Sequence, residues 1–174
     1  MDLWVPHIAI LLLATGAAIT DTRWGLIPNS LTLPPLIAAP VLYYLVAGFA
    51  GLLGSALGAL LCGFCPFLLH RRGALGGGDV KLFAAIGAIA GFSVGLEAQL
   101  FGLTVAAVYV TIRLAVRREL LIVLANAARV VANPLLPRRL RRPPTRVSLA
   151  EVRLGASVLA GTLLAVLGQH GIFD

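Results

Sequence analysis

The stretch LGGGDVKLFAAIG, residues 75–87, runs from three glycines through one aspartate into an apolar block. The rest of the chain is similarly apolar: 59% of its 174 residues are hydrophobic, 12% are charged, and the mean hydropathy is +0.96. A soluble domain carries about twice that share of charged residues. This composition excludes an ordinary soluble domain and predicts one integral membrane domain over residues 1–174.

The apolar residues fall into separate blocks, each close to the length that spans a bilayer. The blocks are residues 3–20, 31–48, 52–69, 80–96, 98–116 and 149–168. The first block is not typical of a secretory signal peptide, because MDLWVPH contains Asp2 and no lysine or arginine. The pattern therefore predicts an all-α membrane protein, a polytopic bundle of about six transmembrane helices.

The basic residues test this division into blocks, because lysine and arginine gather on the cytoplasmic side of a membrane. Each of the 14 basic residues lies in or beside one of three connections: the one between the first and second blocks, between the third and fourth, or between the fifth and sixth. These residues are Arg23, Arg71, Arg72, Lys81, Arg113, Arg117, Arg118, Arg129, Arg138, Arg139, Arg141, Arg142, Arg146 and Arg153. Six alternating helices place all of them on the cytoplasmic side and both termini outside.

The segment 117–147 mixes apolar clusters with arginines. Residues 119–132 are expected to form an amphipathic helix in the membrane interface before the last span. The run PRRLRRPPTR, residues 137–146, then lies against anionic lipid headgroups. Nucleic-acid binding is the less favoured interpretation, because juxtamembrane arginines already act in topology. The SLAE sequence at 148–151 fits a capping box that begins the last block.

Small residues mark the third and fourth blocks, where we expect close helix packing. They are Gly54, Gly58, Gly87, Gly91 and Gly95, together with Cys62 and Cys65. The two cysteines are interpreted as small packing residues, since a closed zinc site needs four ligands. The sequence therefore predicts no metal and no organic cofactor.

Two of the seven acidic residues stand out from the rest. Asp2 and Asp174 are terminal, Glu97 is expected in the outside turn between blocks four and five, and two glutamates lie among arginines. The remaining pair, Asp21 and Asp79, lies at the cytoplasmic ends of the first and fourth blocks. An ionisable side chain at membrane depth is costly, which makes both carboxylates candidates for a functional site.

Two carboxylates at one depth can share a proton, because two like charges that close are not both easily ionised. One then acts as a general base on water and the other as a general acid on a carbonyl. Gly76, Gly77 and Gly78 leave room for an extended peptide beside Asp79. Two structural alternatives stay open: Asp21 could pair with Arg23, and Asp79 could cap its helix.

At these residues the sequence resembles the type IV prepilin leader peptidases, which are GxGD aspartic proteases of the membrane. One match is GGGD at 76–79, continued by VKLFAAIG with Lys81. The other is DTRWGLIPN at 21–29, which includes Arg23, Pro28 and Asn29. The resemblance covers roughly residues 10–115.

The resemblance implies cleavage of the leader of prepilin-like or pseudopilin proteins at the cytoplasmic face of the inner membrane. Asp21 and Asp79 would be the catalytic pair, and Gly76, Gly77, Gly78 and Lys81 would be motif residues beside it. Arg23, Pro28 and Asn29 would belong to the other motif. The resemblance thus implies a prepilin-like or pseudopilin substrate as partner. The arginine-rich segment predicts the anionic cytoplasmic leaflet as a second partner and no nucleic acid, and a homo-oligomer stays open.

One departure separates the chain from the bifunctional members of this family, which also methylate the new N-terminus. Those members carry a cytoplasmic insertion with two CxxC pairs between their first helices. Here residues 21–30 separate the first two blocks and contain no cysteine. The sequence therefore predicts a short form without methyltransferase activity, similar to the peptidases of Flp/Tad pili.

Two other functions are considered. A small proton- or cation-coupled transporter would use Asp21 and Asp79 as its ion site, but both lie at one face and not in mid-membrane. An inactive scaffold for pilus assembly would not need both aspartates intact.

Overall fold

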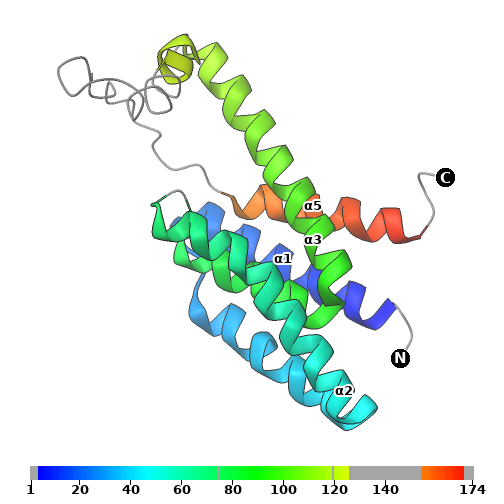
Figure 1. Ribbon diagram of the computed structural model, residues 1–174. Helices are drawn as coiled ribbons and strands as arrows, with labels where there is room; N and C mark the ends of the chain where they lie inside the picture. Colours follow the sequence, from blue (N-terminus) through cyan, green and yellow to red (C-terminus); the bar gives the residue numbers. More distant parts are fainter. Residues whose placement is uncertain (1–3, 74, 119, 126–153, 171–174) are drawn as a thin grey trace, which may run out of the picture. The chain divides into compact units, whose positions relative to one another are not determined.

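The computed structural model describes residues 4–73, 75–118, 120–125 and 154–170. Figure 1 shows their helices: α1 (Trp4–Trp24), α2 (Asn29–Arg71), α3 (Gly77–Val116) and α5 (Gly155–Gln169). Residues 120–125 are also helical, and no strand occurs in the described ranges. The predicted all-α class is confirmed.

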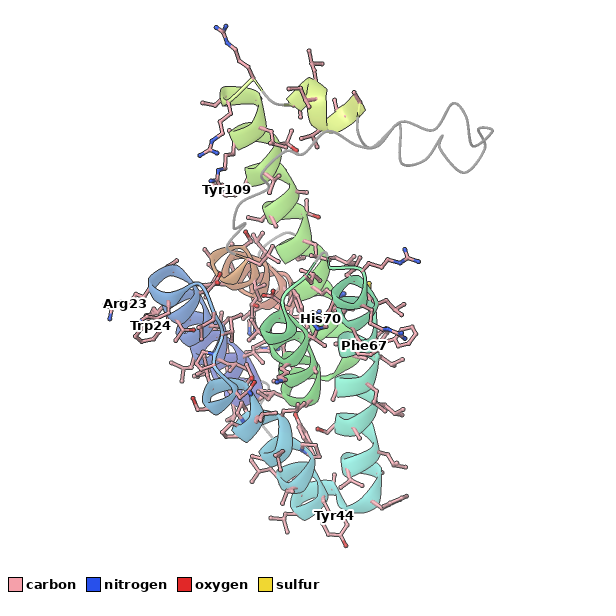
Figure 2. The ribbon with its side chains drawn as sticks, turned by 90° about the vertical axis from the view of Figure 1, so that its left-hand side faces the viewer. Arg23, Trp24, Tyr44, Phe67, His70 and Tyr109 are labelled. Carbon is pink, nitrogen blue, oxygen red and sulfur yellow. The ribbon has the colours of Figure 1, made fainter. Side chains whose placement is uncertain are left out.

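Helix α2 reverses its direction at Gly48. This residue has φ 63° and ψ −151°, a left-handed φ that favours glycine. A Cβ on Gly51 would collide with the carbonyl oxygen of Tyr43, so the chain on the two sides of Gly48 doubles back. Figure 2 shows Tyr44 at this end and Arg23 and Trp24 towards the other. The two parts of α2 correspond to the predicted second and third blocks.

Helix α3 reverses in the same way at Gly91, where φ is 83° and ψ is 174°. A Cβ on Gly95 would lie only 3.0 Å from the Cα of Gly87. Carbonyl groups before the turn lack their usual hydrogen bonds within the helix, and side chains of α2 donate to two of them. Ser55 Oγ donates to the Ala88 oxygen at 2.7 Å, and the Tyr43 hydroxyl donates to the Ile89 oxygen at 2.7 Å.

The expected turn between the fourth and fifth blocks was therefore placed wrongly. The blocks were divided near residue 97, whereas the chain turns at Gly91 and Glu97 lies within the helix that follows. The carboxylate of Glu97 accepts hydrogen bonds from Gln169 Nε2 at 3.1 Å. The four-residue spacing of the glycines indicated one continuous helix face, but Gly91 instead uses its freedom to take a positive φ.

The outer surface of these helices is apolar. Helices α1, α2 and α3 are each long and apolar enough to cross a membrane. Large side chains such as Leu12, Leu45 and Phe49 are more than 60% exposed, which suits contact with lipid and not with water. The chain is a membrane protein. That six segments cross the bilayer, with both termini outside, stays a prediction.

The described residues up to Ala106, together with 154–170, pack into one unit, and those from Ala107 to Ala125 belong to a second. In the first unit, α5 packs against α1. Its core contains Ile10, Phe83 and Val158, from α1, α3 and α5. The prediction of a single domain over residues 1–174 is not tested by this packing.

Glycines allow close contacts between the helices of the first unit. A Cβ on Gly58 of α2 would collide with the carbonyl oxygen of Gly87 in α3. A Cβ on Gly161 of α5 would collide with the backbone nitrogen of Gly102 in α3. Gly54, expected to lie on the same packed face as Gly58, has no neighbour within 4 Å. The predicted close packing is therefore present, but Gly54 takes no part in it.

Much of the predicted interfacial segment, 117–147, lies outside the described residues. Its residues 120–125 are helical, within the amphipathic helix expected at 119–132. The capping box at 148–151 also lies outside the described residues.

We expect Gly58→Ala to lower the free energy of unfolding by about 1–3 kcal/mol, because its Cβ forces α2 away from the backbone of α3. Gly54→Ala, one turn earlier in the same helix, is the matched control. It should be neutral or stabilising by roughly 0.5–1 kcal/mol, because alanine is the better helix former. Denaturant titration of the detergent-solubilised protein measures both. Equal stability of the two variants would contradict this account of the interface.

Candidate active site

Asp21 lies in the last turn of α1, where the helix ends in a glycine cap. The N–H of Gly25 donates to the backbone oxygen of Asp21 at 2.9 Å, and Gly25 has φ 66°. This left-handed glycine after the last helical residue terminates α1. The carboxyl side chain of Asp21 is buried, with 8% exposure, and its Oδ2 accepts the backbone N–H of Gly155 at 2.8 Å.

Arg23 does not form the ion pair with Asp21 that was one of the two structural alternatives. Its side chain is exposed and points outward from α1 beside Trp24 (Figure 2). The buried Asp21 carboxyl group instead has the backbone donor of Gly155. Arg23 and Trp24 form a basic and aromatic pair of the kind found at a membrane interface.

Asp79 lies in the first turn of α3 and is also buried, with 9% exposure. Its Oδ2 accepts the backbone N–H of Gly76 at 3.2 Å. Gly76 immediately precedes the helix, so this contact is half of a capping box, in which an acid in the third helical position reaches back. Asp79 therefore does accept a backbone N–H at the start of its helix, but it does so from the third helical position and not as the N-cap residue.

Asp21 and Asp79 line one cavity of about 200 Å³. Its other lining residues are Gly25, Leu26, Ile27, Gly76, Gly77 and Gly78. Both carboxyl groups thus reach the same cavity, although they lie on different helices. Four of the eight lining residues are glycines, so much of the wall is bare backbone beside a pair of acids.

The three motif glycines have different surroundings. A Cβ on Gly78 would lie 2.9 Å from Ile27 Cβ and 3.1 Å from the Ile27 oxygen. A Cβ on Gly77 would lie at ordinary distance, 3.5 Å, from the ring of His70. Gly78 is therefore required where the loop 25–28 packs on the start of α3. The room that Gly78 leaves for a substrate, which the sequence predicts, does not account for this contact with Ile27.

Lys81 and Asn29 join the two motifs by a direct hydrogen bond. Lys81 Nζ donates to Asn29 Oδ1 at 2.6 Å, which connects the N-terminal parts of α3 and α2. Pro28 precedes Asn29 as the extended N-cap residue of α2, with φ −71° and ψ 147°. These three residues do not line the cavity, but they fix the end of the loop that does.

The two cysteines lie away from the cavity. Cys62 is buried against the α3 backbone, where a Cβ on Gly87 would come within 2.8 Å of its Sγ. Cys65 is exposed, and both thiols are free. Within the described ranges, no three His, Cys, Asp or Glu side chains are grouped to hold a metal ion.

Comparison with known proteins identifies the family. A model of the type IV leader peptidase family matches residues 8–112, which contain both aspartates and the whole cavity lining. The chain belongs to this family. It is 37% identical over 123 residues to a prepilin leader peptidase/N-methyltransferase of Bacillus subtilis (strain 168), covering 66% of this chain and 49% of that protein. The chain thus spans about half the length of this curated relative. No solved structure matched it significantly.

Some residues of the site were not singled out by sequence reasoning. Gly25, Leu26 and Ile27 lie inside the quoted motif DTRWGLIPN, and a glycine after a helical run could have indicated the cap at Gly25. Gly155 carries no such signal, because its role depends on a contact between distant parts of the chain.

The close contact between Gly78 and Ile27 leads to a test by leader cleavage of a prepilin-like protein. We expect Gly78→Ala to lower the rate at least about tenfold, since displacing Ile27 by roughly 1 Å disturbs the cavity wall. Gly54→Ala, outside the cavity lining and with nothing within 4 Å of its added Cβ, is the control and should stay within about threefold of wild type. Similar rates for both variants would contradict this assignment.

Proposed function

We propose that this protein is a membrane-embedded aspartic endopeptidase that removes the leader from prepilin-like proteins. The observation that carries the proposal is the cavity that Asp21 and Asp79 share, in a chain of the leader peptidase family. Both side chains are buried carboxyl groups from separate helices, and both have a backbone donor on Oδ2. This arrangement supports the activation of water by a carboxyl pair.

The reaction follows from two carboxyl groups that share one proton. The ionised carboxylate takes a proton from a water molecule, whose oxygen attacks the carbonyl carbon of the scissile peptide bond. The protonated carboxyl group gives its proton to the carbonyl oxygen. As the tetrahedral intermediate collapses, one of its hydroxyl groups returns a proton to the carboxylate that acted as acid. The C–N bond breaks, and the amine leaves with the proton held by the carboxyl group that acted as base, so that the pair again holds one proton.

The shape of the cavity favours a peptide in extended conformation. Gly76, Gly77 and Gly78 line it next to Asp79, and Gly25 lines it next to Asp21. Glycine lets the backbone of a substrate approach more closely than a residue with a side chain does. The loop residue Ile27 gives the cavity an apolar wall on which an aliphatic side chain could pack.

We further propose that the site opens at the cytoplasmic face of the inner membrane, with six helical segments crossing the bilayer and both termini outside. Asp21 and Asp79 lie where α1 ends and α3 begins, beside Arg23 and Lys81. The excess of basic residues on this side supports the orientation. The leader of a substrate would be cleaved before its hydrophobic helix enters the membrane.

The connection between α1 and α2 supports a peptidase without methyltransferase activity. Helix α1 ends at Trp24 and α2 begins at Asn29, so only residues 25–28 lie between them. These four residues form the wall of the cavity and the cap of α2, which leaves no inserted domain at this position.

The central test is cleavage of a co-expressed prepilin-like protein from the same genome, read as a size shift. We expect Asp21→Asn and Asp79→Asn each to lower cleavage by at least about 10³-fold, since each amide lacks the proton transfer of the carboxyl group. Membrane-fraction yield and melting temperature serve as folding controls. Wild-type activity in either folded variant would overturn the carboxyl pair.

A second measurement tests the absence of methylation. With S-adenosylmethionine present, we expect the mass of the cleaved product to equal that of the unmethylated chain. The bond-cleaving site should work without a methyl donor, because the carboxyl pair needs only water. A mass increase of one methyl group that appears only when S-adenosylmethionine is present would show that the chain is bifunctional after all.

A further inference from the structure

The start of α5 reaches the carboxyl group of Asp21. The N–H of Gly155, the first residue of α5, donates to Asp21 Oδ2 at 2.8 Å, and the contact is buried. The first N–H groups of a helix have no partner within the helix, and they lie at its partially positive end. A buried carboxylate is a strong acceptor for such a group.

The position admits only a glycine without rearrangement. A Cβ on Gly155 would lie 2.8 Å from Asp21 Cβ, 3.0 Å from the Ala17 oxygen and 3.0 Å from Ala18 Cα. Helix α5 therefore touches the backbone of α1 in the turn that carries Asp21. A larger residue must move either α5 or that turn, and both movements change the Asp21 carboxyl group.

We propose that Gly155 is a positioning residue for Asp21, so that α5 completes the active site. This inference rests on the proposed peptidase function. A carboxyl group turns easily about its last side-chain bond. The hydrogen bond to Oδ2 sets that rotation while Asp21 lines the cavity.

The two aspartates differ in where their support originates. Asp79 is held by Gly76, three residues before it, at the start of its own helix. Asp21 is held by a residue 134 positions away, beyond the 8–112 region that the family model matches. Half of the carboxyl pair is therefore oriented only when α5 has docked on α1.

The kinetic test compares Gly155→Ala with Gly102→Ala in the purified full-length chain. A Cβ on Gly102 would press on α5 from α3, 3.3 Å from Val158 Cα, without touching Asp21. For cleavage of the same prepilin-like protein, we expect Gly155→Ala to lower kcat about 100-fold with KM within about twofold of wild type. Gly102→Ala should keep kcat within about threefold, with rates corrected for the folded fraction.

A kcat of Gly155→Ala within about threefold of wild type would overturn the proposal. An equal fall of kcat in both variants would overturn it as well, because general displacement of α5 would then explain the loss. A rise of KM alone would assign Gly155 to substrate binding and reject positioning of Asp21.

A spectroscopic test does not depend on activity. In the wild-type chain labelled with ¹⁵N-glycine, the Gly155 amide is identified as the resonance that disappears in Gly155→Ala. We expect Asp21→Asn to move this amide proton upfield, because an uncharged amide oxygen is the weaker acceptor. An unchanged resonance would overturn the contact. If wild type cleaves no prepilin-like protein, the peptidase proposal fails, while this shift still decides whether Gly155 holds Asp21.

Discussion

Two buried carboxyl groups in an apolar bundle have to find hydrogen-bond donors, and the structure supplies them from the beginnings of helices. Asp79 accepts an N–H at the start of α3, and Asp21 accepts one at the start of α5. Helix beginnings always have spare N–H groups, whereas a buried carboxylate without donors is strongly destabilising. The end of α1 and the starts of α3 and α5 must therefore meet at one place, and the remaining packing of this unit makes that meeting possible.

Glycine contacts bring these helix ends together. Lipid gives little hydrophobic drive for one helix to associate with another, so close van der Waals packing has to do so. Gly58 meets Gly87 between α2 and α3, and Gly161 meets Gly102 between α5 and α3. The same principle operates next to the carboxyl groups, where Gly78 accommodates Ile27 and Gly155 accommodates the Asp21 turn. Packing and site therefore depend on the same property, the absence of a side chain.

Hydropathy and charge predicted the helical class and most segment boundaries, because these depend on local composition. The turn at Gly91 was placed near residue 97, where Glu97 interrupts the apolar run between the fourth and fifth blocks. The turn instead lies at Gly91, which has a positive φ. Ser55 and Tyr43 of α2 donate hydrogen bonds to the carbonyl groups of Ala88 and Ile89 just before it. Asp21 and Asp79 could be singled out because acids are rare in apolar blocks. The contacts Gly78–Ile27 and Gly155–Asp21 could not, since they join distant segments and leave no periodic signal.

The size of the cavity restricts how the proposed enzyme can take its substrate. About 200 Å³ is far less than a helix with its side chains requires, since such a helix is about 10–12 Å wide. A peptide bond reaches the carboxyl pair only in an extended segment. A prepilin-like protein would offer such a segment where its leader precedes its hydrophobic helix. Irregular backbone at membrane depth is tolerated where it lines a wet cavity, and Gly76 and residues 25–27, which lie outside the helices, provide part of such a lining. The proposed cleavage at the ends of the helices agrees with this constraint, because Asp21 and Asp79 lie where α1 ends and α3 begins, next to the non-helical residues of the cavity wall.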